Sequence, residues 1–111
     1  VAGIYAPDPD STLRVSHSTI SANDGYGIDV AGTVFLDNSI VAGNNSGGPD
    51  LYGPFDPTTS GYNLIGNGDG SGLTNGVNGN QVGSTGGLLN PMLGPLADNG
   101  GPSLGPPAAP E

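Results

Sequence analysis

The chain has 111 residues, of which 33% are hydrophobic, 22 are glycine and 11 are proline. This length fits one domain, and so much glycine and proline indicates disorder unless the sequence repeats with a fixed period. One Lys+Arg residue against ten Asp+Glu residues gives a net charge of −9, which excludes binding to nucleic acid or anionic lipid. With no cysteine and no long apolar run, a disulfide framework and insertion into a membrane are excluded as well.

A repeat dominates the first half of the chain. A shift of 21 residues matches one apolar and polar pattern to the next: Leu13, Val15, Ser18, Ile20 and Asn23 to Val34, Leu36, Ser39, Val41 and Asn44. A third, less regular copy begins at Tyr62. Each copy has short alternating apolar runs separated by Asn and Gly, which predicts short strands joined by tight turns. We therefore predict an all-β, parallel β-helix of about three coils over residues 1–67.

Stacked coils place equivalent side chains in files. Two files of turn residues are predicted: Asn23, Asn44 and Asn67 in one, and His17, Asn38 and Asn63 in the other. Asn tolerates the left-handed backbone of a tight turn and can hydrogen-bond to the residue stacked on it. We expect both files to be structural ladders, with His17 a turn residue rather than a catalytic one.

The glycine-rich part of the chain follows. We interpret residues 68–87 as a long loop or loosely formed coil that wraps the stack. Residues 88–104 carry apolar side chains that we expect to cover the open end of the β-helix, namely Leu88, Leu89, Met92, Leu93 and Leu96. Residues 105–111 read Gly-Pro-Pro-Ala-Ala-Pro-Glu and predict an extended tail.

Three runs of residues resemble one group of proteins. They are Asn38-Ser39-Ile40-Val41-Ala42-Gly43-Asn44, Ser60-Gly61-Tyr62-Asn63-Leu64-Ile65-Gly66-Asn67 and, most specifically, Asn90-Pro91-Met92-Leu93-Gly94-Pro95-Leu96-Ala97-Asp98-Asn99-Gly100-Gly101-Pro102. They are similar to the C-terminal coils of bacterial right-handed parallel β-helix surface proteins of the choice-of-anchor type. The resemblance covers roughly residues 13–104. It implies right-handed coils, a scaffold role and a secreted, extracellular or cell-surface location.

One loop imitates the start of a calcium-binding loop. Asn67, Asp69 and Ser71 supply oxygen atoms at alternating positions, and a glycine stands sixth. The twelfth position is Asn78 instead of a bidentate glutamate, so a plain turn competes with the calcium site. We expect that no cofactor is required and that calcium is the candidate metal.

Catalytic arrangements have little support in the sequence. A glycosidase needs carboxylates that converge on one face, and two pairs are candidates: Asp8 with Asp10, and Asp29 with Asp50. Both pairs are explained more simply as solvent-exposed turn acids. A polysaccharide lyase needs cationic groups, and Arg14 is the only Lys or Arg. One histidine among many serines gives no signal for a catalytic triad, so we predict a protein without enzymatic activity.

Asn44-Asn45-Ser46 fits the acceptor pattern for N-glycosylation, with Asn44 as the modified residue.

A β-helix of three coils buries a small core and exposes unpaired strand edges at both ends. Two remedies exist: the chain is a piece of a longer solenoid, or copies of it stack end to end. We predict a self-assembling structural protein that forms a homo-oligomer or filament. One alternative is a fragment of a secreted adhesin or glycan-binding protein, and another is a remnant of a carbohydrate-active enzyme. A glycan site would draw on the aromatic residues, which are Tyr5, Tyr26, Phe35, Tyr52, Phe55 and Tyr62.

Overall fold

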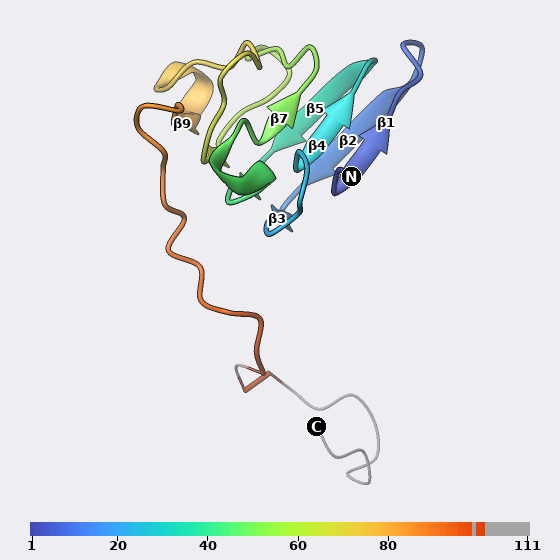
Figure 1. Cartoon of the computed structure of the whole chain (residues 1–111). Coiled ribbons are helices and arrows are strands. Elements are labelled where there is room, and N and C mark those ends of the chain that lie inside the picture. The colour runs from blue at the N-terminus through green and yellow to red at the C-terminus, as the bar shows by residue number, and fades with distance from the viewer. Residues whose placement is uncertain (99, 102–111) are drawn as a thin grey trace, which may run out of the picture.

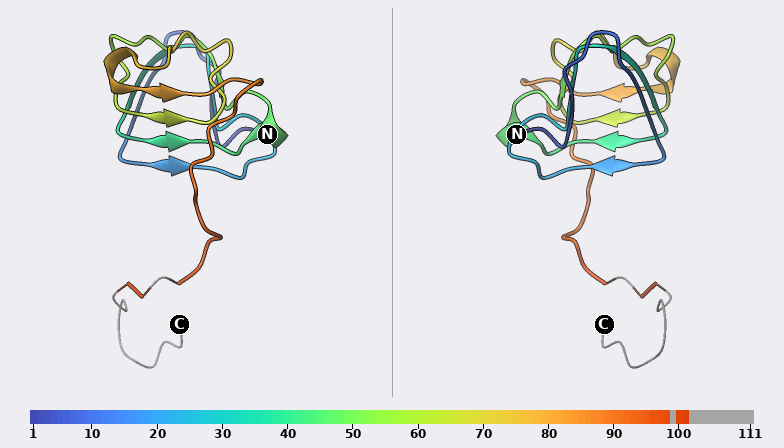
Figure 2. Two further views of the ribbon diagram at one scale, coloured as in Figure 1. Left: turned by 90° about the vertical axis from the view of Figure 1, so that its left-hand side faces the viewer. Right: turned by 90° about the vertical axis from the view of Figure 1, so that its right-hand side faces the viewer.

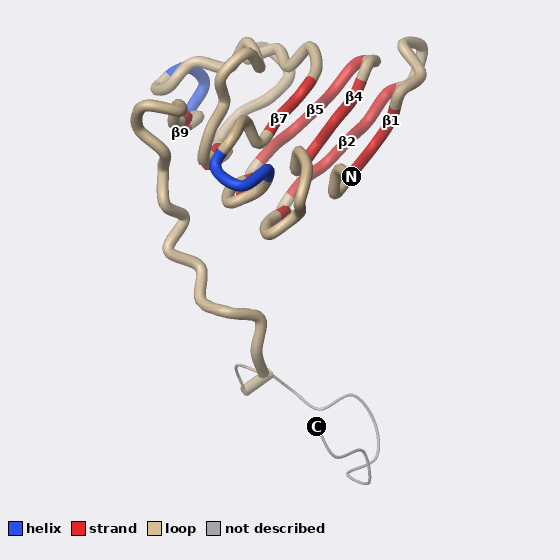
Figure 3. Tube along the Cα trace, in the orientation of Figure 1, coloured by secondary structure: helices blue, strands red, loops and turns tan. Residues whose placement is uncertain are grey.

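Short strands alternate with turns because apolar pairs in this sequence are repeatedly interrupted by Asn, Gly and Pro. The computed structural model describes residues 1–98, 100 and 101, and Figure 3 shows how much of their length lies in turns and loops. Nine strands form in these described residues: β1 (Ile4–Ala6), β2 (Thr12–Ser16), β3 (Thr19–Ile20), β4 (Ile28–Val30), β5 (Thr33–Asp37), β6 (Ile40–Val41), β7 (Leu51–Tyr52), β8 (Leu64–Ile65) and β9 (Gln81–Val82). Two short 3-10 helices lie at Asn45–Gly47 and Val77–Gly79.

The strands pair in parallel with their equivalents in neighbouring coils and form three sheets. The first sheet is β1-β4-β7, the second is β2-β5 and the third is β3-β6-β8-β9. Figure 1 shows the strands of the first two sheets side by side, and Figure 2 shows the four strands of the third sheet stacked like rungs. The predicted parallel β-helix is confirmed. It has about four turns, because the third sheet contains four strands.

The 21-residue shift is the register of the first two coils. Leu13 is paired with Val34, Val15 with Leu36 and Ile20 with Val41. Stacking apolar residues on apolar residues at each step produces a continuous narrow interior.

The fourth coil lies within residues 68–87, which the sequence predicted as a loop or loosely formed coil. Its strand β9 extends the third sheet, where Val82 is paired with Ile65. The spacing between paired residues is 21 from Ile20 to Val41, 24 from Val41 to Ile65, and 17 from Ile65 to Val82. Because the period is not constant, a self-comparison at a single shift cannot find this coil.

One residue with a left-handed backbone lies two residues before the strand of the third sheet in every coil. These residues are His17, Asn38, Tyr62 and Gly79, with φ of 50, 52, 57 and 72°. The predicted file of His17, Asn38 and Asn63 is therefore wrong at its third member. Tyr62 occupies that position, because the third coil is shifted by 24 residues, and Asn63 lies one residue further on.

The core is one cluster of buried apolar side chains inside the coils: Val15, Ile28, Val30, Val34, Leu36, Val41, Leu51, Phe55, Ile65 and Leu73. Coil 1, which holds β1 to β3, contributes only Val15 to this cluster. Ile4, Ala6, Leu13 and Ile20 are only partly buried. The interior is therefore open at the N-terminal end of the stack.

The apolar residues expected to cover an open end do not do so. Leu88, Met92, Leu93 and Leu96 are exposed, with Met92 at 87% and Leu96 at 106%. After Leu89 donates its N–H to Gly66, the segment leaves the last coil and runs along the side of the stack past β3 (Figure 2). Prolines at 91 and 95 cannot donate a ladder hydrogen bond, which disfavours an added strand. The predicted tail 105–111 and the end of the predicted covering segment, 102–104, lie outside the described residues.

Leu36 tests the packing of the interior. Its side chain is wholly buried, and replacing it with alanine leaves a cavity that a narrow coil cannot close. We expect Leu36→Ala to lower the free energy of unfolding by about 2–5 kcal/mol, measured by urea denaturation followed by circular dichroism. The control is Thr12→Ala on the exposed edge of β2, for which we expect a change of less than about 0.5 kcal/mol. Equal effects of the two substitutions would contradict a packed interior.

Candidate functional site

Asparagines at the corners of the stack are joined by hydrogen bonds that run between coils. The backbone N–H and side-chain amide of Asn23 both donate to Asn44 Oδ1, at 3.1 and 2.9 Å. Asn44 in turn donates its backbone N–H and its amide to Asp50 Oδ1, both at 2.8 Å. Asp50 Oδ2 accepts the backbone N–H of Asn67 at 2.8 Å. The structure thus places Asn23, Asn44 and Asn67 in one network, but Asp50 stands between the last two.

Asp50 is a buried carboxylate, not the exposed turn acid that the sequence suggested. It is 2% exposed, and three N–H donors surround its two oxygens. Such donors replace the water that a charged group loses on burial. The candidate carboxylate pair of Asp29 with Asp50 is also wrong, because Asp29 is paired with Tyr52 and Asp50 comes two residues before Tyr52.

A second internal ladder was missed by the sequence analysis. Ser18 N–H donates to Ser39 Oγ at 3.1 Å, Ser39 N–H to Asn63 Oδ1 at 3.0 Å, and Asn63 N–H to Asn80 Oδ1 at 3.1 Å. Each member immediately precedes a strand of the third sheet. A polar residue in that position in every coil is the signal that would have found the ladder.

The calcium-like loop forms a hydrogen-bonded turn. Asn67 Oδ1 accepts the N–H of Asp69, and the Ser71 hydroxyl donates to the carbonyl of Gly68 at 2.6 Å. Asp69 Oδ2 accepts the N–H of Thr85 at 2.8 Å. Among the residues described, no group of three or more His, Cys, Asp or Glu side chains is placed to hold a metal. These oxygens therefore stabilise the corner between the third and fourth coils, and calcium binding stays a prediction.

Asn44 lies in the wrong place for a glycan. It is wholly buried, and its amide nitrogen donates to both the Ile20 carbonyl and Asp50. A sugar on that nitrogen would break both bonds and force the coils apart, so the folded chain cannot present this acceptor.

The remaining candidate catalytic residues lie in exposed turns. His17 is exposed at the corner between the second and third sheets. Asp8 Oδ1 accepts the N–H of Asp10 at 2.8 Å in the turn after β1, which gives this pair a structural role.

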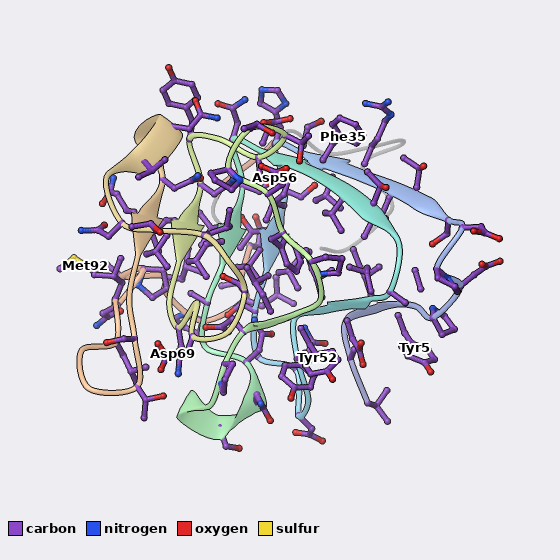
Figure 4. All side chains as sticks on the ribbon, turned by 90° about the horizontal axis from the view of Figure 1, so that it is seen from above. Tyr5, Phe35, Tyr52, Asp56, Asp69 and Met92 are labelled. Atoms are coloured by element: carbon purple, nitrogen blue, oxygen red, sulfur yellow. The ribbon has the colours of Figure 1, made fainter. Side chains whose placement is uncertain are left out.

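A row of outward-facing residues crosses the first sheet. Tyr5, Asp29 and Tyr52 are register partners in three successive coils. The two tyrosines are 66% and 58% exposed, and Figure 4 shows both projecting from the same side of the stack. The ring of Tyr26 lies 5.2 Å from that of Tyr52, centroid to centroid, with a tilt of 38°. We call these four residues the tyrosine face.

The tyrosine face borders an open groove. Tyr5, Asp29 and Tyr52 line it together with Pro7, Gly53 and Pro54. Gly53 has φ of 135°, and a Cβ there would lie 2.3 Å from the carbonyl oxygen of Val30. Only glycine lets the chain leave β7 this close to the coil below, so the groove wall is fixed by the backbone.

The only Lys or Arg lies elsewhere. Arg14 lies on β2 with its guanidinium carbon 4.0 Å from the centre of the Phe35 ring. Figure 4 shows Phe35 on the opposite side of the stack from Tyr5 and Tyr52. The tyrosine face therefore carries one carboxylate and no Lys or Arg.

Comparison with protein-family models, with curated proteins and with solved structures finds no match to this chain. In the part of the chain that the structure describes, no helix has the length and apolar character needed to cross a bilayer.

Asp50 tests the ladder. In Asp50→Asn, one oxygen that accepts N–H bonds becomes an amide nitrogen, which faces another donor. We expect the free energy of unfolding to fall by about 2–4 kcal/mol, since a buried partner is left unsatisfied. The control Asp24→Asn removes an exposed acid and is expected to change it by less than about 0.5 kcal/mol. Urea denaturation measures both, and an unchanged Asp50→Asn midpoint would show that the ladder is dispensable.

Acid should weaken the corner held by Asp69. Two hydrogen bonds from Thr85, chiefly that from its backbone N–H and secondly that from its side chain, lower the pKa of Asp69 below its usual value of 3.8. Since the folded pKa is the lower one, this stabilisation is fully present above the unfolded pKa and is lost as pH falls through the folded pKa. We expect Asp69→Asn to reduce the acid sensitivity of the urea midpoint between about pH 5 and pH 2. A profile as steep as that of the natural chain would contradict this.

Proposed function

We propose that this chain is a non-enzymatic structural protein of the cell surface or extracellular matrix whose copies associate through the open end of the β-helix. The observation that carries this proposal is that the strands of coil 1 have unpaired edges. Within the described residues, β1, β2 and β3 each have a partner strand on one side only. The three strands of coil 1 thus present unpaired N–H and C=O groups along their free edges, and each edge is a template for another strand.

The burial of apolar side chains also indicates that coil 1 is the end at which copies associate. Ile28, Leu36 and Val41 of the second coil are wholly buried, whereas Ile4, Leu13 and Ile20 of coil 1 are only partly covered. A further coil laid over coil 1 would remove these side chains from water, which contributes about 25 cal/mol per Å² of apolar surface.

The opposite end of the stack is less open. In β9 the outward N–H of Val82 already donates to Asn75 Oδ1 at 3.0 Å, and the turn Ser84–Gly87 is closed by its own pair of hydrogen bonds. Contact of coil 1 with the last coil of another copy would replace the Asn75 bond by a strand pairing and would propagate into a filament. Contact between two first coils would close as a dimer.

One observation supports a protein without enzymatic activity: the aspartates that the sequence analysis considered as catalytic pairs do not converge on one face. Asp29 lies on the tyrosine face, Asp50 is buried in the ladder, and Asp8 and Asp10 share an exposed turn. The cell-surface location is supported by the resemblance of the sequence to bacterial β-helix surface proteins.

A proline on the free edge of β2 tests the association. His17 N–H donates to Asp37 and the Ser11 carbonyl accepts from Thr33, both across the β2–β5 pairing. Because pairing directions alternate along a parallel strand, the N–H of Arg14 faces the free edge. Arg14→Pro should therefore leave the β2–β5 ladder intact, block the edge, and weaken association at least about tenfold.

The matched control is Arg14→Thr, which loses the contact with Phe35 but keeps the edge N–H. Sedimentation velocity over a concentration series, with electron microscopy of the concentrated samples, measures the association. We expect the natural chain and Arg14→Thr to associate alike, as dimers or as filaments. A natural chain that stays monomeric at every concentration, or an Arg14→Pro chain that associates as strongly, would overturn the proposal.

A further inference from the structure

The tyrosine face carries a second inference, which does not depend on the association of copies. Three of its members come from three different coils, and parallel pairing brings them into one line along the stacking axis. Adjacent strands of a sheet lie about 4.8 Å apart, so the positions of Tyr5 and Tyr52, two coils apart, are separated by about 10 Å. This separation is close to the length of a disaccharide unit.

The rings are held ready for contact. Tyr5 follows the partly buried Ile4 and Tyr52 follows the buried Leu51 along their strands, so the sheet fixes the outward direction of both tyrosines. Tyr26 packs against one side of the Tyr52 ring, which limits the ring's freedom before any ligand arrives. A site that is ordered in advance binds with a smaller entropic cost.

The chemistry of the face matches a sugar. An aromatic ring offers a flat apolar surface to the C–H face of a pyranose, and its hydroxyl offers a polar contact at the rim. Asp29 lies between the two exposed rings, and its carboxylate accepts hydrogen bonds from hydroxyl groups. Binding sites of this kind combine aromatic walls with a few placed polar groups.

The charge selects among sugars. Asp29 has no Lys or Arg beside it, and the whole chain carries a net charge of −9. A polyanionic glycan such as a polyuronate would be repelled, whereas a neutral glycan would not.

We propose that Tyr5, Asp29 and Tyr52, with Tyr26 behind Tyr52, form a binding site for a neutral polysaccharide that lies along the stacking axis of the β-helix.

The test is a binding measurement on the full chain with defined oligosaccharides. The probes are four neutral hexasaccharides, of cellulose, mannan, laminarin and chitin, and hexagalacturonate as the anionic counterpart. Titration calorimetry measures affinity, and tyrosine emission reports on the site, because the chain has four tyrosines and no tryptophan. We expect at least one neutral probe to bind and hexagalacturonate to bind at least tenfold more weakly.

Variants assign the site. Tyr5→Ala and Tyr52→Ala should each weaken binding of the neutral probe at least tenfold, and Asp29→Ala at least threefold. Tyr52→Phe keeps the ring and should stay within threefold of the natural chain. The matched control is Tyr62→Ala, which removes a tyrosine that is 69% exposed but lies at another corner, and it should leave binding unchanged.

Several outcomes would overturn the proposal. They are binding of none of the neutral probes, preference for hexagalacturonate, or equal losses in Tyr62→Ala and Tyr52→Ala. A fourth is that Tyr5→Ala and Tyr52→Ala change the sedimentation of the protein and not its sugar affinity, which would make the face a contact between copies. Circular dichroism and the urea midpoint of each variant confirm that it is folded. Failure of the Arg14→Pro experiment leaves this proposal standing. That experiment concerns the free strand edges of coil 1, whereas the sugar site lies on the outer face of the first sheet.

Discussion

The carboxylate of Asp50 links coils that the backbone ladders alone would leave loosely joined. The long corners between the third and first sheets carry no regular strand pairing, and their polar groups must be satisfied inside the stack. Asp50 accepts donors from Asn44 on one oxygen and from Asn67 on the other, so a single side chain joins two successive corners. In the described part of the chain, every buried side-chain nitrogen and oxygen has a hydrogen-bond partner. The thin apolar interior is therefore accompanied by a complete polar one.

Apolar and polar side chains occupy different parts of the interior. Apolar side chains stack under the strands, where alternation sends every second residue inward. Ser, Asn and Asp stack under the corners, where a polar side chain can accept a backbone N–H from the coil beside it. This arrangement explains how a chain with 33% hydrophobic residues folds. Much of the glycine and asparagine that would suggest disorder by count lies at positions where the corners need left-handed backbone or a stacked hydrogen bond.

Sequence alone gives the fold and much of the first two coils, because there the repeat is regular and each match, such as Val15 with Leu36, is a true pairing. It loses the register in the third coil, where a one-residue error exchanges the exposed Tyr62 for the buried Asn63. It misses the burial of Asp50, since a lone acid after a proline has the composition of an exposed turn. Only its three N–H donors, two from Asn44 and one from Asn67, reveal its place. The tyrosine face needs the register of the first sheet, which joins residues 5, 29 and 52 at unequal spacings.

The unequal lengths of the coils are confined to particular corners. Between the second and third sheets every coil uses two residues, one left-handed and one polar and inward, as at 17–18, 38–39 and 62–63. Between the first and second sheets the connection is 7–11 in coil 1, 31–32 in the second and longer in the third. The corner between the second and third sheets therefore has a constant length, whereas the corner between the first and second sheets varies in length from coil to coil. Such a scaffold can acquire new surface loops at the corner of variable length, near Asp56 (Figure 4), without disturbing the register of any sheet.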